Sequence, residues 1–266
     1  MQRGGALIPA FSRRRREQRQ QGAFVNYNWN WRIFWDPSPE GTGTYLDTLL
    51  QGLLVTVEVA ALAWAVALVF GCVMGLLRVL PSRAGQAVGA AYVEVFRNVP
   101  LLVQLFLWYY VLPEVVPEAA GNWLKGLQNA PFLISAAGLG LFMSARVAEQ
   151  LRAGLSALPQ GQRYAGTALG LTTLQTYRYV LLPMAFRIIL PPLTSELVNT
   201  IKNTSVALTI GLLELTARAR AMQEFSFQVF EAFTAATIGY LLLNLLATLA
   251  MRALERRVRV PGYVGS

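Results

Sequence analysis

Histidine is absent from the 266-residue sequence, and cysteine occurs once, at Cys72. Histidine is the commonest metal ligand and the usual proton carrier near neutral pH, so its absence removes most acid–base and metal chemistry. A single cysteine excludes an internal disulfide and any zinc site built from several cysteines. The Gly-x-x-x-x-Gly-Lys-Ser/Thr loop that cradles nucleotide phosphates is also missing. We therefore expect no catalytic residue, no metal site and no cofactor bound by this chain, and a membrane enzyme is the weakest functional alternative.

Charged residues are scarce, at 14% of the sequence, whereas hydrophobic residues make up 55%. A spanning helix needs about 20 mainly apolar residues. Lipid offers the backbone no hydrogen-bond partners, so long apolar runs cross the bilayer as helices. A polar, amphipathic connection at 214–231 precedes the last run. The sequence predicts an all-α integral membrane bundle of about five transmembrane helices, at 49–77, 88–112, 132–150, from Pro183 onward and at 232–251.

Basic residues are in excess, with a net charge of +9, and they are unevenly placed. Arg78, Arg83 and the arginines of 252–259 follow apolar runs, whereas 113–124 contains no lysine or arginine. Because positive charge stays on the cytoplasmic side, we expect a cytoplasmic C-terminus and, with five spans, an external N-terminus. The arginines at 13–16 oppose this bias but lie beyond the roughly 15–20 residues over which it acts. Anionic lipid explains the charge better than nucleic acid does.

Composition divides the chain into four parts. Residues 1–26 form a polar, arginine-rich arm, and residues 27–48 form an aromatic segment typical of the membrane–water interface. Residues 49–252 form the transmembrane domain, which includes a basic segment at 151–182, and residues 253–266 form a cytoplasmic tail. The aromatic segment carries Tyr27, Trp29, Trp31, Phe34 and Trp35.

The most informative stretch is 162–183, QRYAGTALGLTTLQTYRYVLLP, which lies between long apolar runs. Its small residues Ala165, Gly166, Ala168 and Gly170 predict a short helix with little side-chain bulk. Basic residues in this stretch place it on the cytoplasmic side. Such a segment is a suitable handle for a partner protein; the alternative is an ordinary cytoplasmic hairpin.

The spacing of this stretch resembles the coupling-loop signature of bacterial ABC-importer permeases. In that signature, Glu-Ala-Ala is followed by three residues, a glycine, nine residues, an aliphatic residue, one further residue and Leu-Pro. Here the positions hold Tyr164-Ala165-Gly166, Gly170, Val180 and Leu182-Pro183. Tyr164 and Gly166 differ from the signature, so no contact of the family's glutamate is carried over to this chain.

Further stretches extend the resemblance to polar amino-acid ABC permeases. They are 92–104, YVEVFRNVPLLVQ, and 195–211, SELVNTIKNTSVALTIG. The likeness is strongest to glutamate/aspartate importer permeases, in 175–196, QTYRYVLLPMAFRIILPPLTSE, and 255–263, ERRVRVPGY. The resemblance covers about 27–263 and implies the type I ABC importer permease fold in a bacterial cytoplasmic (inner) membrane.

The resemblance also implies a transporter of several parts. Two ATPase subunits, which hold ATP and Mg²⁺, would dock on the coupling segments of this chain and of a second, identical or related, permease subunit. A periplasmic or tethered binding protein would deliver the amino acid; membrane lipid is a further partner, and nucleic acid is not. The residues implied in ATPase coupling are Arg163, Tyr164, Ala165, Gly166, Ala168, Leu169, Gly170, Leu182 and Pro183.

The run from Pro183 onward contains the largest set of polar residues. Polar residues inside a span are costly and often mark a transport path. At 100° per residue, Glu196, Asn199 and Asn203 share one stripe of a helix, which Lys202 flanks. Lys202 is expected to pair with Glu196 or with a ligand carboxylate; the alternative roles of the stripe are helix–helix hydrogen bonding or a place near the outer surface. The predicted substrate path is Glu196, Asn199, Lys202, Asn203 and Ser205.

A second polar group follows the motif YVEVFRNVPLLVQ. Glu94 and Arg97 are three residues apart and are expected to pair, and Pro100 is expected to kink the span. Arg146, Glu149 and Arg152 have the same spacing of three, which predicts a salt-bridge ladder on one helix face. The residues assigned a structural or gating role are Glu94, Arg97, Asn98, Pro100, Gln104 and Glu149.

Together these features predict the membrane-spanning permease subunit of an ATP-driven amino-acid importer, with glutamate or aspartate as the expected cargo. It would work by alternating access, in which closure of the ATPase pair reorients the spans. The alternatives are a permease for another polar amino acid, a passive channel that needs no coupling segment, and a structural membrane adaptor.

Overall fold

The computed structural model describes residues 27–40 and 43–258, with the Arg163 side chain also left undescribed. The arginine arm at 1–26 and the end of the predicted tail therefore lie outside the described residues. Within the described ranges the chain is helical, and its one β-type pairing is an isolated bridge between Pro37 and Thr44. The predicted all-α class is confirmed.

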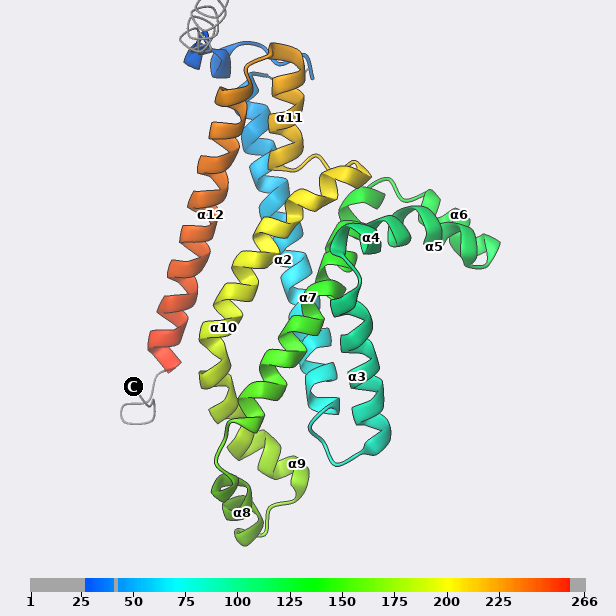
Figure 1. The fold of residues 1–266 in the computed structure, drawn as a ribbon, viewed down its shortest axis with the longest axis vertical. Helices are drawn as coiled ribbons and strands as arrows, with labels where there is room; N and C mark the ends of the chain where they lie inside the picture. The colour runs from blue at the N-terminus through cyan, green and yellow to red at the C-terminus, as the bar shows by residue number, and fades with distance from the viewer. Residues whose placement is uncertain (1–26, 41–42, 259–266) are drawn as a thin grey trace, which may run out of the picture.

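The helices follow one another along the whole described chain (Figure 1). The four long spans are separated by short helical pieces, several of them tighter or wider than a regular α-helix. The elements are η1 (Trp31–Trp35), α2 (Tyr45–Leu77), α3 (Arg83–Asn98), α4 (Leu101–Phe106), η2 (Leu107–Val111), α5 (Leu112–Val115), α6 (Glu118–Lys125), α7 (Ala130–Ser156), α8 (Gln160–Ala168), α9 (Thr173–Thr176), η3 (Tyr177–Leu181), α10 (Leu182–Asn203), η4 (Thr204–Ile210), α11 (Leu215–Ser226) and α12 (Val229–Val258).

Four helical stretches in the described chain are long and apolar enough to cross a membrane: Tyr45–Leu77, Ala130–Ser156, Thr173–Ile210 and Val229–Val258. They contain the predicted spans at 49–77, 132–150, from Pro183 and at 232–251, so these predictions are confirmed. Counting one bent helix pair as a further span gives five.

The predicted span at 88–112 is broken at Pro100, where the sequence predicted a kink. The helix stops at Asn98 and restarts at Leu101, and the two parts differ in direction by 101°. Val99 is extended, as expected for the residue before a proline, and Pro100 supplies no N–H to continue the helix. Gln104 stabilises the break, because its Nε2 donates to the carbonyls of Phe96 (3.0 Å) and Val99 (2.9 Å).

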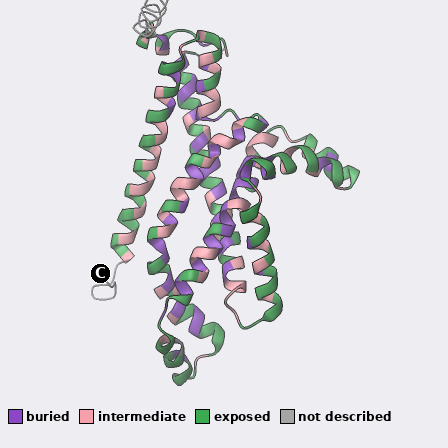
Figure 2. Cartoon of the chain, viewed as in Figure 1, coloured by how far each residue is buried: buried purple, intermediate pink, exposed green. Residues whose placement is uncertain are grey.

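The core forms where α7 packs against α2 and α10. Small residues allow this approach: a Cβ on Gly71 would lie 2.5 Å from the Val147 Cβ, and one on Gly140 would lie 2.6 Å from the Val66 Cβ. Close packing through small residues is the usual way helices associate in lipid. Burial follows α2, α7 and α10, whereas α12 is exposed along most of its length and is the least buried of the spans (Figure 2).

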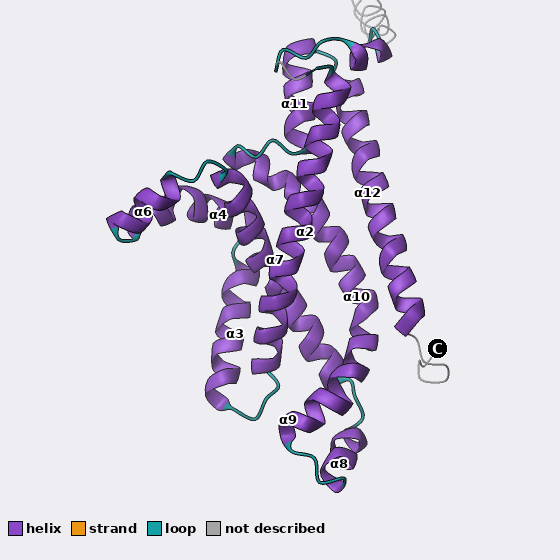
Figure 3. Cartoon of the chain, turned by 180° about the vertical axis from the view of Figure 1, so that it is seen from behind, coloured by secondary structure: helices purple, strands orange, loops and turns teal. Residues whose placement is uncertain are grey.

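Different helices form the two ends of the bundle. α8, α9 and the C-terminal end of α12 lie at one end, and η1, α11 and the start of α12 lie at the other (Figures 1 and 3). The predicted amphipathic connection at 214–231 contains the helix α11, which packs against α2 and α12. Glu214 and Glu231, which flank it, are both fully buried at 0% exposure.

Candidate functional site

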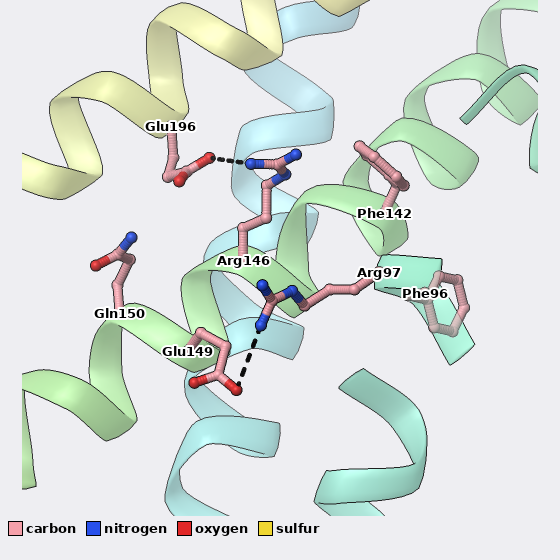
Figure 4. A pocket seen from close by; sticks show the side chains of 7 residues that line it. All are labelled: Phe96, Arg97, Phe142, Arg146, Glu149, Gln150 and Glu196. Carbon is pink, nitrogen blue, oxygen red and sulfur yellow. Dashed lines mark ion pairs between the residues drawn. The ribbon is translucent and has the colours of Figure 1, made fainter. Parts of the chain in front are cut away.

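A cavity of about 280 Å³ opens between α3, α7 and α10. Figure 4 shows four of its side chains, from three helices, turned toward a common space: Arg97, Arg146, Glu149 and Glu196. The helix break at Pro100 ends α3 close to the cavity, which places Arg97 near the end of that helix. The lining residues are Phe96, Arg97, Phe142, Arg146, Glu149, Gln150 and Glu196.

Glu149 already has strong partners on one side of the cavity. Its Oε1 lies 2.5 Å from Nη1 of Arg78, and its Oε2 accepts from Nε of Arg152 at 2.9 Å. Arg97 is the outer member of this group, with Nη1 3.6 Å from Glu149 Oε1. That distance is too long for a hydrogen bond. Arg97 is therefore attracted by Glu149 but keeps its donors available.

Glu196 and Arg146 form the opposite side. Their closest atoms, Oε2 and Nη1, are 3.8 Å apart, again beyond hydrogen-bond length. The Glu196 side chain is only 10% exposed, and within the described part of the chain its Oε2 has no hydrogen-bond partner. Burying a carboxylate oxygen without a hydrogen-bond donor raises the free energy of the folded protein. A ligand that supplies a donor to this oxygen would therefore bind favourably.

The cavity thus offers two guanidinium groups and one incompletely paired carboxylate. The Arg97 and Arg146 side chains are 54% and 45% exposed, and the Arg146 guanidinium lies 5.7 Å from the centre of the Phe142 ring. Guanidinium groups bind carboxylates through paired, charge-assisted hydrogen bonds. A carboxylate without a donor suits an ammonium group. The arrangement is therefore able to hold a small zwitterion that carries excess negative charge.

Of the predicted path residues, Glu196 lines the cavity. Asn203 points its amide toward Met143 Sδ (3.9 Å), Asn199 is half-buried, and Lys202 is exposed. Ser205 lies beyond α10, in η4, and donates to the Lys202 carbonyl at 2.7 Å. Among the described residues no ion pair joins Lys202 to Glu196; the carboxylate faces Arg146 instead.

The predicted pair of Glu94 with Arg97 is also wrong in its partners. Glu94 accepts from the Asn98 amide at 2.9 Å, and Arg97 turns toward Glu149 on α7. The predicted ladder forms only in part, since Arg152 pairs with Glu149 but Arg146 pairs with Glu196. Pro100 and Gln104 make the helix break, as described above.

Sequence reasoning missed part of the cavity. Phe96, Phe142 and Gln150 carried no signal of their own, and Arg78 was treated only as a marker of the cytoplasmic side. Arg146 did carry a signal, because a charge inside an apolar run is expected to have a function. Its assignment to a local ladder hid its contact with α10.

The predicted short helix at 162–169 is α8, and Gly170 explains how it ends. Gly170 has φ +73°, its N–H donates to the Thr167 carbonyl at 3.0 Å, and the Leu171 N–H donates to the Gly166 carbonyl at 3.1 Å. This is the Schellman ending, which favours glycine at the left-handed position. α9 then begins with a capping box made by Thr172 and Gln175.

The small residues of α8 do not all face outward. Gly166 is buried, and a Cβ there would lie 2.6 Å from Cγ2 of Thr176 on α9. The glycine therefore allows α8 to pack on α9 within this chain. Tyr164 and Leu169 are exposed, at 66% and 77%. Ala165 and Ala168 are exposed as well, Arg163 lies in α8, and Leu182 and Pro183 begin α10.

Residues 67–260 match the family described as "Binding-protein-dependent transport system inner membrane component". The chain belongs to this family. It is 46% identical over 244 residues to the glutamate/aspartate import permease protein GltJ of Escherichia coli (strain K12), covering 91% of this chain and 99% of the relative. It is 30% identical over 231 residues to the glutamine transport system permease protein GlnP of the same organism, covering 87% and 98%.

A solved structure has the same fold. The structure described as "Crystal structure of an amino acid ABC transporter with histidines" matches with a TM-score of 0.69 and 30% identity, covering 80% of this chain and 95% of the other. These findings confirm the resemblance that the sequence carries. The chain is a multi-pass inner-membrane permease subunit of an ABC importer, so it is a transport component and not an enzyme.

Proposed function

We propose that this permease carries acidic amino acids and that the cavity between α3, α7 and α10 holds the cargo on its path. The observation that carries the proposal is the charge of the cavity: Arg97 and Arg146 with available guanidiniums, and Glu196 with an oxygen that lacks a donor. Glutamate and aspartate each carry two carboxylates and one ammonium. This matches two guanidiniums and one carboxylate in number and sign.

The same charges disfavour neutral cargo. A neutral amino acid has one carboxylate and would leave one of the two guanidiniums without an anion. Hydrogen bonds to charged groups contribute about 1.5–3 kcal/mol each, which corresponds to a preference of about 10-fold to 100-fold. The 46% identity to a glutamate/aspartate import permease supports the acidic cargo. The second candidate is another polar amino acid, supported by the 30% identity to a glutamine permease.

The partners follow from the same proposal. ATPase subunits, which hold ATP and Mg²⁺, dock on the exposed side of α8, where Tyr164 and Leu169 project from the chain. A second permease subunit, identical or related, completes the path, and a binding protein delivers the amino acid at the opposite end of the bundle. The role of α8 rests on the spacing of its motif and on this exposed surface.

The proposed orientation places α8 and the C-terminus in the cytoplasm. The C-terminal ends of α2 and α12 lie toward the end of the bundle that holds α8 and α9 (Figure 1). Arg78 caps α2, Arg178 lies in η3 directly after α9, and Arg252 and Arg256 lie in the last turns of α12. Positive charge on one side of a membrane protein marks the cytoplasmic side. The stretch 115–126, which contains α6, and the aromatic segment from Tyr27 are then external or at the outer interface.

The test is cargo uptake by variants of the assembled transporter in liposomes. Arg97→Met and Arg146→Met each keep the length of the side chain and remove the charge. Each is expected to lower glutamate uptake by about 10-fold or more while the permease and ATPase still co-purify. The matched control is Arg220→Met, because Arg220 lies on α11, is 60% exposed and pairs only locally with Glu224.

Two outcomes would reject the proposal. Full glutamate uptake by both variants at normal protein level would remove the cavity from the path. Faster uptake of glutamine than of glutamate by the unmodified transporter would establish the second candidate instead.

A further inference from the structure

The coupling segment is joined to the cargo cavity by a chain of direct contacts. The first contact is between α8 and α9, where Gly166 packs on Thr176, a side chain that is only 4% exposed. A Cβ at Gly166 would lie 2.8 Å from the Thr176 hydroxyl oxygen, so the two helices touch without a gap. A displacement of α8 is therefore passed to α9.

The second contact leaves the coupling segment. Tyr177 follows Thr176 directly, is 5% exposed, and donates its hydroxyl to the Val79 carbonyl at 3.0 Å. Val79 lies in the turn between α2 and α3. A cavity of about 430 Å³, lined by Pro81 and Leu171 among others, lies beside this hydrogen bond. The turn and the coupling segment therefore have room to shift relative to each other, and the hydrogen bond crosses between them.

The third contact enters the cargo cavity. Arg78, next to Val79, ends α2 and pairs with Glu149 at 2.5 Å. Glu149 in turn attracts Arg97, whose Nη1 lies 3.6 Å away and whose side chain is 54% exposed. The structure shows Arg97 in one arrangement, near Glu149 and lining the cavity. A second arrangement, with the guanidinium turned to an anion in the cavity, would make Arg97 the two-state element that a coupling mechanism requires.

We propose that the Tyr177–Val79 hydrogen bond and the Arg78–Glu149 ion pair transmit the movement of the coupling segment to Arg97. Glu149 is a positioning residue in this scheme. When Arg78 is withdrawn with the turn, Glu149 is left with less positive charge and attracts Arg97 more strongly. Arg97 is then neutralised more fully by Glu149 and attracts a cargo carboxylate less strongly, so the affinity of the cavity for a dicarboxylate falls, which favours release. The link rests on the proposed docking of the ATPase on α8, and this last step rests also on the proposed cargo site.

The test follows the link without any cargo. In full-length permease assembled with its ATPase in nanodiscs, Cys72→Ser removes the native thiol and Val95→Cys provides a site for an environment-sensitive fluorophore. Val95 is 59% exposed and lies on α3, two residues before Arg97, outside the cargo cavity. In the labelled protein that keeps Tyr177 and Glu149, binding of ATP with orthovanadate is expected to change the fluorescence at position 95.

Two substitutions break the link at separate points. Tyr177→Phe keeps the ring and removes the hydroxyl, and Glu149→Gln keeps the shape and removes the charge. Each substitution is expected to reduce the fluorescence change that the nucleotide causes. Tyr177→Phe is also expected to shift the nucleotide concentration at half-maximal change by about fivefold, the effect of one ordinary hydrogen bond. The control for the first is Tyr179→Phe, on the same element with a ring that is 64% exposed. The control for the second is Glu224→Gln, in the exposed pair on α11.

An unaltered nucleotide response in both link variants, with the ATPase bound, would overturn the proposal. If one variant fails to assemble, the other decides, because Glu149 and Tyr177 lie on different helices. The readout also separates the two proposals. Unchanged cargo uptake by Arg97→Met and Arg146→Met would reject the cargo site, whereas the fluorescence response would still report the link.

Discussion

The α11 end of the bundle and the cavity between α3, α7 and α10 use buried carboxylates in opposite ways. At the end that holds α11, Glu214 accepts from the Ala217 N–H (2.8 Å) and the Tyr240 hydroxyl (2.5 Å). Glu231 accepts from the Asn30 N–H (2.7 Å) and the Tyr27 hydroxyl. Each has both oxygens bonded, whereas in the cargo cavity Oε2 of Glu196 has no donor among the described residues and its cation is 3.8 Å away.

The difference separates structure from function. A buried carboxylate with complete hydrogen bonding fixes the helices that supply its donors, and losing it destabilises the fold. A buried carboxylate with one oxygen lacking a donor has lost its hydration without a compensating hydrogen bond, and a ligand donor would supply that bond. Glu214 thus joins α11 to α12, and Glu231 holds the aromatic N-terminal segment against α12. For Glu196 we propose that the missing donor is a charged group of the cargo.

The largest expected effect is on transport at Glu196. Glu196→Gln keeps the shape, removes the charge and breaks no hydrogen bond of Oε2 that the structure describes. We expect the folded protein level to be normal and glutamate uptake to fall by about 10-fold to 100-fold, the value of a charge-assisted hydrogen bond. Uptake of labelled glutamate into liposomes measures this. A lower thermal midpoint with proportionally reduced uptake would show that Glu196 is structural, like Glu214.

The intermediate effect is on stability at Glu214. Glu214→Leu removes the helix cap of α11, which costs about 1 kcal/mol, and leaves the Tyr240 hydroxyl with fewer partners, which costs about 1–3 kcal/mol. Thermal unfolding of the detergent-solubilised protein, followed by tryptophan fluorescence, is expected to shift to lower temperature. Adding Tyr240→Phe should recover part of the loss, and the recovery would be missing if the two side chains did not act together.

Such a contrast between carboxylates is invisible in the sequence. Glu196, Glu214 and Glu231 all lie within or beside apolar runs, and the donors that distinguish Glu214 and Glu231 include the distant residues Tyr240 and Tyr27. The long apolar runs and the coupling motif, by contrast, are local signals. They predicted four spans and the helix α8 correctly, because helix length depends on neighbours in the chain; the ending of α8 at Gly170 was not predicted.

The residues of the cargo cavity were predictable from the sequence only in part. Hydrophobic length predicted a span at 88–112, since about 20 apolar residues suffice to cross the bilayer, and Pro100 predicted a kink in it. Neither predicted a break with a 101° change of direction. The i,i+3 rule placed Arg146 with Glu149, although Arg146 faces Glu196 on another helix. Helix periodicity identifies which residues share a face, but the neighbour that meets this face is set by tertiary packing.

The smallest expected effect is at Lys202, which sharpens the comparison from outside the cavity. Lys202 is exposed near the end of α10, and the contact that the structure gives it, from Ser205 to its carbonyl, involves the backbone only. Lys202→Met keeps this contact, so the folded protein level should not change. A cation in the last turn of a helix contributes about 0.3–1 kcal/mol to helix stability through the helix dipole. Lys202 does not line the cavity, so we expect a small fall in the thermal midpoint and nearly normal glutamate uptake. Parallel uptake and thermal unfolding measurements on Lys202→Met and Glu196→Gln make the comparison.

The two outcomes for Lys202 have opposite meanings. A loss of uptake in Lys202→Met as large as that in Glu196→Gln would extend the cargo path along α10, because an exposed lysine reaches that magnitude only by binding the cargo itself. Full uptake at normal protein level would exclude Lys202 from the path.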